Sequence, residues 1–343
     1  MAAAIAIVGG AAGTAQAAWV AQLSAFPVPS GAAGQGIARG PDGNVWFTEY
    51  SGQRIGRVTP AGAVTEFPIG GTSAKGAEDI VAGSDGNLWF AEIRSDSIGR
   101  ITPGGTVTEF ATPTAGSAPV GIAAGPDGNL WFTEWGTQAI GRITPAGTIT
   151  EFPISTSNAS PQGITSGPDG NLWFTEAYGN KIGRITPSGT ITEYPVPTAL
   201  AHPDVIASGP DGNLWFTEYS AGKIGRITPG GAITEFALPT AGSSPLGITT
   251  GSDGNLWFTQ PGFDVTSGHE SKLGQITPAG IVTETPVLCS SIPGEITTGA
   301  DGALWMIDEL GNAIDRVTVV GQTGPNGLGA SAPDPPTLGD CVA

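Results

Sequence analysis

The chain has 343 residues, with 13 lysine and arginine side chains against 30 aspartate and glutamate side chains, so its net charge is −17. This acidity excludes nucleic acid as a partner, because the chain has no basic surface to neutralise phosphates. Gly (55) and Pro (29) are frequent, and β-branched and aromatic residues recur between them. That pattern is typical of many short strands joined by turns.

The N-terminal segment is apolar and rich in small residues, and it ends in an A-x-A pattern at Ala15-Gln16-Ala17. These features predict a secretory signal peptide over residues 1–18. The mature protein is then expected outside the cytoplasm, as a monomer without a membrane span. In that compartment Cys289 and Cys341 are predicted to form a disulfide that ties the C-terminal tail to the body.

Seven tryptophans divide the chain into copies of one repeat. They are Trp46, Trp89, Trp131, Trp173, Trp215, Trp257 and Trp305. Most of the spacings are 42 residues, and a period of roughly 40–45 residues with four strand-like runs is typical of a β-propeller blade. The sequence therefore predicts an all-β, seven-bladed propeller with four-stranded blades.

The copy over residues 163–197 gives the order of the predicted strands. GITSG is the inner strand, LWFTE the second, KIGRIT the third and TITEYPVP the outer strand, with Pro/Gly turns between them. The last copy lacks an outer strand, and residues 19–29 carry the outer-strand pattern ahead of the first copy. We therefore expect the N-terminal strand to complete the last blade and close the ring. Residues 19–320 then form a single propeller, followed by a flexible tail over 321–343.

Most of the acidity belongs to the repeat, because 18 of the 30 acidic residues occupy three repeated positions. One is the Asp of each Asp-Gly turn, which turn formation alone explains. Another is the Glu that ends the second strand, and the Arg of the third strand is expected to pair with it, as in Glu134 and Arg142. Both residues become glutamine in the sixth copy, at Gln260 and Gln275. The outer-strand Glu is expected at the solvated rim.

Functional residues are expected where the copies differ. The loops before the inner strands and the loops between the second and third strands should share one mouth of the ring. The variable residue before each inner strand is, in chain order, Gln35, Glu78, Val120, Gln162, Asp204, Leu246 and Gly294. This mixed polar and apolar ring predicts a binding site for a small or medium amphipathic ligand, either a small molecule or a peptide-like compound.

The sixth and seventh copies depart furthest from the repeat. A seven-residue insertion in the sixth is expected to bring Phe263 and His269 to the mouth. Phe263 is a candidate ligand contact, and His269 is a candidate general base because histidine transfers protons near neutral pH. In the seventh copy Glu295, Asp308 and Glu309 are candidate ligands for Mg²⁺, since paired carboxylates can hold a hard cation. The alternative is that these are ordinary surface side chains.

The repeated phrase GPDGNLWFTE…IGRITPxGxITEFP resembles the streptogramin B lyase (virginiamycin B lyase) family over about residues 20–320. The resemblance implies a seven-bladed propeller and an elimination that opens a cyclic depsipeptide antibiotic without water. In that family a histidine removes the proton next to the ester carbonyl, and bound Mg²⁺ polarises the carbonyl.

Carried over to this chain, the family's catalytic histidine falls on Gly294, and its metal-side glutamates fall on Ile292 and Glu309, of which only Glu309 matches. A second family histidine falls on Leu246, and a family tyrosine falls on Gln35.

Two functions therefore remain open. The first is an exported propeller that binds a ligand at its mouth without turning it over. The second is a Mg²⁺-dependent carbon–oxygen lyase with a relocated base, in which His269 removes the proton and Glu309, with Asp308 or Glu295, holds the metal.

Overall fold

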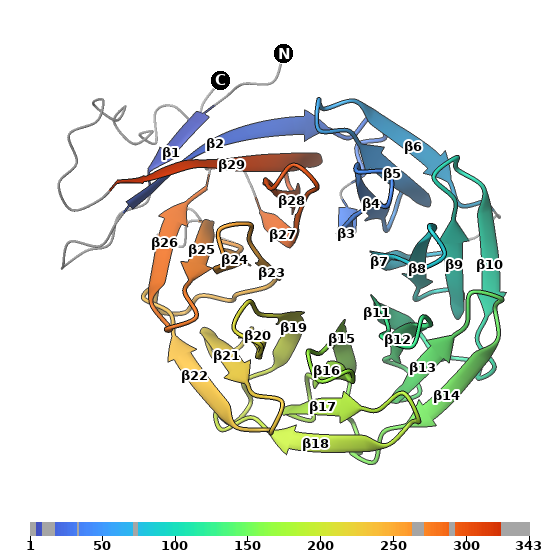
Figure 1. The fold of residues 1–343 in the computed structure, drawn as a ribbon. Coiled ribbons are helices and arrows are strands. Elements are labelled where there is room, and N and C mark those ends of the chain that lie inside the picture. Colours follow the sequence, from blue (N-terminus) through green and yellow to red (C-terminus); the bar gives the residue numbers. More distant parts are fainter. Residues whose placement is uncertain are drawn as a thin grey trace.

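The computed structural model describes residues 5–8, 18–32, 34–70, 75–262, 271–287 and 292–323. Over these residues seven antiparallel sheets stand around a common axis, with their first strands innermost (Figure 1). The predicted seven-bladed all-β propeller is confirmed. In the described part of the chain, no helix has the length and apolar character needed to cross a bilayer.

Each blade runs from an inner strand at the axis to an outer strand at the rim. Blades 1 to 3 are β3 (Gly34–Arg39), β4 (Val45–Glu49), β5 (Arg54–Val58), β6 (Val64–Pro68); β7 (Ala77–Ala82), β8 (Leu88–Glu92), β9 (Ser97–Ile101), β10 (Val107–Ala111); and β11 (Pro119–Ala124), β12 (Leu130–Glu134), β13 (Ala139–Ile143), β14 (Ile149–Pro153). Blades 4 to 6 are β15 (Pro161–Ser166), β16 (Leu172–Glu176), β17 (Lys181–Ile185), β18 (Ile191–Pro195); β19 (Pro203–Ser208), β20 (Leu214–Glu218), β21 (Lys223–Ile227), β22 (Ile233–Ala237); and β23 (Ile248–Thr250), β24 (Leu256–Gln260), β25 (Lys272–Ile276), β26 (Val282–Pro286).

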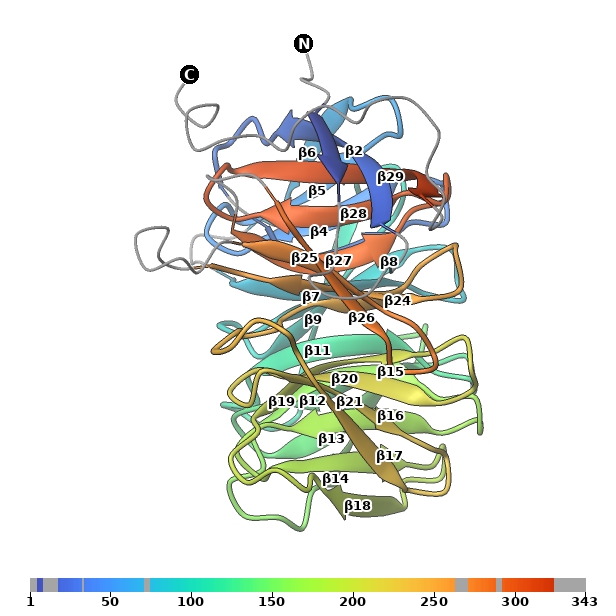
Figure 2. The same cartoon turned by 90° about the vertical axis from the view of Figure 1, so that its left-hand side faces the viewer.

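Blade 7 joins the two ends of the chain. Its strands from the axis outward are β27 (Pro293–Thr298), β28 (Leu304–Asp308), β29 (Ala313–Thr323), β2 (Ala18–Pro27) and β1 (Ile5–Val8). β2 pairs with β29 along its whole length, and Figure 2 shows both strands at the same edge of the ring. The predicted closure by the N-terminal strand is confirmed. The structure adds β1, which pairs with β2 and lies within the segment predicted to be a signal peptide.

The hydrophobic core lies between neighbouring blades. In one cluster Trp131 of blade 3 packs against Ile164 and Phe174 of blade 4, and all three are buried. The Trp131 indole nitrogen donates to Asp127 Oδ1 of the Asp-Gly turn (3.1 Å), and its ring stacks on Phe152 at 5.6 Å between centroids. Each blade therefore buries its tryptophan against the next blade and satisfies the indole nitrogen within its own turn.

The repeated Arg belongs to this tryptophan unit, and the predicted Glu–Arg bridges are wrong. The β12–β13 register places Trp131 opposite Arg142 and Glu134 opposite Ala139. The Arg142 guanidinium lies 5.5 Å from the Trp131 ring centroid and donates to the Pro187 carbonyl of the next blade. In four other blades the corresponding Arg also pairs with the Asp of the turn, in Arg57–Asp42, Arg184–Asp169, Arg226–Asp211 and Arg316–Asp301.

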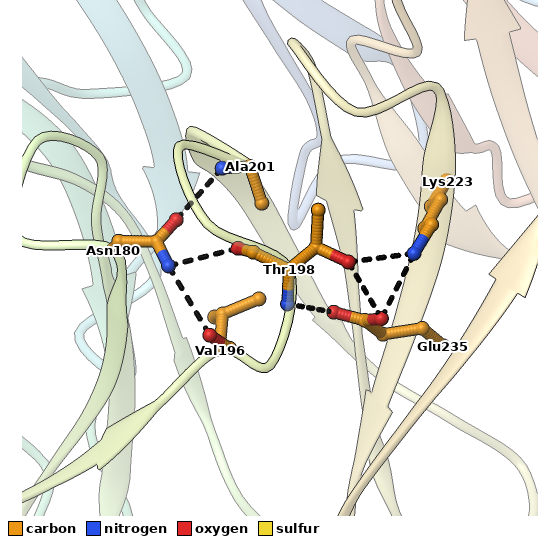
Figure 3. Close-up of polar contacts among 6 residues, drawn as sticks. All are labelled: Asn180, Val196, Thr198, Ala201, Lys223 and Glu235. Atoms are coloured by element: carbon orange, nitrogen blue, oxygen red, sulfur yellow. Dashed lines mark hydrogen bonds and ion pairs between the residues drawn. The ribbon is translucent and has the colours of Figure 1, made fainter.

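The outer-strand glutamates are not merely solvated, as had been expected, because they hold the loop that arrives from the preceding blade. In Figure 3, Glu235 of β22 accepts hydrogen bonds from the Thr198 backbone nitrogen and hydroxyl, both at 2.8 Å, and from Lys223 Nζ at 3.0 Å. On the other side of the loop, Asn180 donates to the carbonyls of Val196 and Thr198 and accepts from Ala201. We call this contact between an outer-strand Glu and the preceding loop a latch.

The same latch recurs around the ring. Its hydroxyl and carboxylate partners are Thr114 with Glu151, Thr156 with Glu193, Thr198 with Glu235, and Thr240 with Glu284. Each latch fixes the loop that leads to the next inner strand, so the rim of the propeller positions residues at its axis.

Candidate functional site

A cavity of about 300 Å³ opens at the axis of the ring. The variable residues predicted to form the mouth line it: Gln35, Glu78, Val120, Gln162, Asp204 and Leu246. Glu295 and Glu309 of blade 7 line it as well. The structure therefore brings residues from all seven blades to one space.

A β-bulge explains why these residues face the axis. In blade 3, Pro119 pairs with Glu134 and Ile122 with Phe132, so Val120 and the following glycine stand opposite the single residue Thr133. The same shift in register occurs in blades 1, 2, 4, 5 and 7. A bulge re-aims side chains relative to a regular strand. In blades 1 to 5 the first residue of the bulge lines the cavity, and in blades 2 and 7 an acidic second residue lines it.

In blades 1, 3 and 4 the second residue of the bulge is glycine, and the next blade approaches closely there. A Cβ added to Gly121 would lie 2.4 Å from the Gln162 carbonyl oxygen. The Thr133 hydroxyl spans the same gap, since it accepts from the Gly121 nitrogen at 2.9 Å and donates to the Gln162 carbonyl at 2.7 Å. This threonine bridge is a second link between neighbouring blades.

Asp79 lines the cavity and was missed by sequence reasoning. It replaces the bulge glycine in blade 2, where the bridging threonine is replaced by Ala91. The Asp79 carboxylate accepts from the Ile80 nitrogen at 2.7 Å and from the Ile122 nitrogen of blade 3 at 3.0 Å. Blade 7 shows the same double change, with Glu295 for glycine and Ile307 for threonine. The absence of the threonine was the signal that could have identified these acids.

Five carboxyl groups make the cavity strongly acidic: Glu78, Asp79, Asp204, Glu295 and Glu309. No lysine, arginine or histidine is among the residues that line it. Burial raises the pKa of Asp204 to about 6, and burial together with the charge of Asp79 raises the pKa of Glu78 to about 7. Burial, with the charges of Asp79 and Asp204, raises the pKa of Glu295 well above its usual range. The charges of Asp79 and Asp204 thus increase the cost of ionising their neighbours Glu78 and Glu295.

The loop that the latch of Figure 3 holds carries Leu200 and His202 and leads to Asp204, and His202 contacts aromatic side chains that follow the second strands of blades 4 and 5. The His202 ring contacts Tyr178 edge-on at 5.1 Å and Tyr219 at 6.2 Å between centroids. Tyr178 is 61% exposed, and Leu200 is 84% exposed with a positive φ of 55°. We call Tyr178, Leu200, His202 and Tyr219 the aromatic rim.

Three other residues predicted for the site, Phe263, His269 and Asp308, are not among those that line the cavity in the described part of the chain. Phe263 and His269 lie outside the described residues. Asp308 does not line the cavity, because its Oδ1 accepts from the backbone nitrogens of Ile292 and Gly311 within its own blade.

The predicted Mg²⁺ ligands do not gather into one site. Within the described ranges, no group of three or more His, Cys, Asp or Glu side chains is arranged to hold a metal ion. Glu295 and Glu309 both line the cavity, whereas Asp308 is directed into its own hairpin. The described residues therefore do not fit a resident Mg²⁺.

Comparison with known proteins identifies the family. The chain matches the virginiamycin B lyase family over residues 14–204, 126–265 and 158–336. The chain belongs to this family. A solved streptogramin B lyase structure is 36% identical, with a TM-score of 0.80, and the match covers 87% of this chain and 98% of that one. A catalytically inactive histidine-to-alanine variant of virginiamycin B lyase from Staphylococcus aureus, with quinupristin, is 37% identical over 88% of this chain and 100% of that one, with a TM-score of 0.81.

Curated relatives match over a shorter stretch. Virginiamycin B lyases of Bordetella parapertussis and Bordetella bronchiseptica are 46% identical over 50 residues, which is 14% of this chain and 16% of each relative. This local match is one repeat in length, whereas the structural matches extend over nearly the whole propeller.

The bridging role of Asp79 predicts a specific rescue. Asp79→Gly should lower the free energy of unfolding by about 1–3 kcal/mol, because two backbone nitrogens lose their acceptor. Adding Ala91→Thr to that variant recreates the glycine–threonine pair of blade 3 and should restore most of the loss. Urea denaturation of the two variants and the parent measures both effects, and a double variant as unstable as Asp79→Gly would refute the role assigned to Asp79.

Proposed function

We propose that this virginiamycin B lyase family propeller binds a small or medium amphipathic ligand that carries a positive charge. The observation that supports this most directly is the composition of the axial cavity, with five carboxyl groups and no basic side chain. A cavity lined by charges of one sign favours ligands of the opposite sign and speeds their association. Val120 and Leu246 supply apolar surface in the same space.

The aromatic rim supports the amphipathic part of the proposal. His202 is followed directly by Pro203 and Asp204, so an apolar body on the rim can place its charged group next to the Asp204 carboxylate. Exposed aromatic and aliphatic side chains beside a polar cavity are typical of ligand sites. The quinupristin complex of the S. aureus relative supports a peptide-like ligand as one class to test.

Phenethylamine and phenethyl alcohol form a matched pair of probes that differ in charge. Near pH 8, above the pKa of about 6 for Asp204 and of about 7 for Glu78, these two carboxyls are largely ionised, and the amine should bind at least roughly five-fold more tightly than the alcohol. Asp204→Asn should remove most of this preference, and so should a fall to about pH 5, because protonation of Asp204 and Glu78 discharges the cavity. Isothermal titration calorimetry measures both affinities.

The control for that experiment is Asp85→Asn, which removes one charge at the exposed turn between β7 and β8, at the far end of β7 from the cavity. Equal affinities for amine and alcohol in the parent, or an equal loss of amine affinity in Asp85→Asn and Asp204→Asn, would contradict binding in the cavity.

A second candidate is lyase activity, and the position of Gly294 supports it. A Cβ added to Gly294 would lie 3.0 Å from Glu309 Oε1. The resemblance to the family places its catalytic histidine at this position. A side chain at position 294 would therefore face Glu309 at the cavity. The glycine leaves this position without a base, so activity in the parent would need a base from elsewhere, with His269 as the candidate.

Incubation with a streptogramin B and Mg²⁺, followed by detection of the linear product, tests this candidate. Gly294→His should raise the rate on the order of 100-fold over the parent, because it adds a general base beside Glu309. If neither protein forms the product, the lyase candidate fails. Parent activity that survives His269→Ala would exclude His269 as the base.

A further inference from the structure

The glutamates that end the second strands of blades 1 to 5 form a ring of buried acids: Glu49, Glu92, Glu134, Glu176 and Glu218. Each is 0% exposed. None pairs with the repeated Arg, which belongs to the tryptophan unit. Neither carboxylate oxygen of Glu218 has a hydrogen-bond partner among the described residues. An ionised carboxylate left in such a place would cost several kcal/mol.

These buried acids meet the latch glutamates instead. The strand register places Glu134 and Glu151 at the same positions as Gln260 and Glu284 of blade 6, whose side chains are in contact. Two neighbouring carboxyl groups repel each other when both are ionised, so one of them is expected to hold a proton.

The sequence of blade 6 differs at the buried position and indicates which of the two carboxyl groups holds the proton. Gln260 stands where the other blades have the buried glutamate, and its Nε2 donates to Oε1 of the latch residue Glu284 at 3.0 Å. An amide nitrogen therefore occupies the place of a carboxyl oxygen, and it acts as a donor. A glutamate can make the same hydrogen bond only when it is protonated.

The latch glutamate is the charged partner in each pair. Glu235 accepts from a backbone nitrogen, a hydroxyl and Lys223, and Glu193 accepts from Thr156 and Lys181. These donors hold the pKa of both latch carboxyls below its usual range against the effect of burial. The buried glutamates have few such donors, so the shared proton resides on them.

We propose that the buried glutamates are neutral acids that donate to the latch carboxylates, and that their ionisation above neutral pH loosens the latches between blades. This inference does not depend on the proposed ligand. The latch holds the loop before each inner strand, so its loosening would also release residues such as Asp204 at the axis.

Each buried acid faces its own set of charged and polar groups. These are Glu66, Arg54 and Ser30 for Glu49; Glu109, Lys75 and Ser95 for Glu92; Glu151, Asp96 and Thr137 for Glu134; Glu193, Lys181 and Thr156 for Glu176; and Glu235 and Lys223 for Glu218. Burial, the largest cause, raises the pKa to about 7 for Glu49 and Glu134 and to about 8 for Glu176 and Glu218, with the neighbouring glutamate adding to the rise.

The sign of the pH effect follows from these shifts. The unfolded chain releases these protons near a pKa of about 4.5, whereas the folded protein keeps them to about 7 or 8. The folded state therefore binds more protons over this window. The stability from the buried acids is fully present below the unfolded pKa and is lost as the pH rises through the folded values.

The test compares the parent with a variant in which Glu49, Glu134, Glu176 and Glu218 are changed to Gln, copying blade 6. The melting temperature of the parent should fall by roughly 5–10 °C between about pH 5.5 and about pH 8.5, and the variant should fall by clearly less. The cavity carboxylates are present in both proteins, so they contribute equally to the change of melting temperature with pH in each. Equal slopes would overturn the proposal.

Gln260→Glu is the reverse substitution, and it keeps the test decisive if the four-fold variant does not fold. It adds a sixth buried acid, so it should steepen the fall in melting temperature with pH. Infrared difference spectra near pH 6.5 give a second readout, in which each Glu→Gln change should remove intensity from the protonated carboxylic acid band. A band unchanged by the substitutions, or an unchanged slope in Gln260→Glu, would contradict the assignment of the proton.

Discussion

The close approach of neighbouring inner strands at the axis is the constraint on which the rest of the molecule depends. At Gly121 the next blade's carbonyl leaves no room for a Cβ, and a threonine hydroxyl ties the two backbones together. The two residues of the bulge are where the copies differ at the axis, and in blades 2 and 7 an acid takes the place of the glycine. These positions determine the chemistry of the cavity, on a scaffold that the copies otherwise share.

Because the sequence repeats, the blades, the closure of the ring and many of the residues that line the cavity could be predicted from it. The tryptophan period and the Asp-Gly turns identified the blades, and the missing outer strand of the last copy identified the ring closure, because each is a local pattern repeated many times. The variable residues that line the cavity, such as Asp204 and Leu246, could be found because positions that differ among otherwise similar copies are free of the scaffold's constraints.

The pairing of charges could not be predicted in the same way. Glu and Arg disappear together in blade 6, but each glutamine adapts to a different carboxylate. Gln260 donates to the latch residue Glu284, and Gln275 donates to Asp253 of the turn. The opposite charges of the repeated Glu and Arg suggested that they pair with each other. The strand register instead places each of them next to a different partner. Pairing side chains by opposite charge cannot find a contact between two acids, because such a contact requires one carboxyl group to stay protonated, and burial keeps it so.

Contacts at the rim of the propeller position residues at its axis, because the latched loops lead directly into the inner strands. The latch on Thr198 orders the loop that carries Leu200 and His202 and leads to Asp204 in the cavity. A substitution at the rim can therefore alter the site without touching a ligand. The repeat can be retained with glycine at position 294, because the contact that this residue makes with blade 6 uses its backbone carbonyl, which accepts from the Thr259 hydroxyl at 2.7 Å.

A crystal structure of the protein with phenethylamine tests most directly whether the axial cavity binds cationic groups. The account predicts the ammonium nitrogen at roughly 3 Å from a carboxylate oxygen of Asp204 or Glu295, with the phenyl ring directed toward Tyr178 and Tyr219. An ammonium group bound only at repeated carboxylates outside the cavity would contradict it.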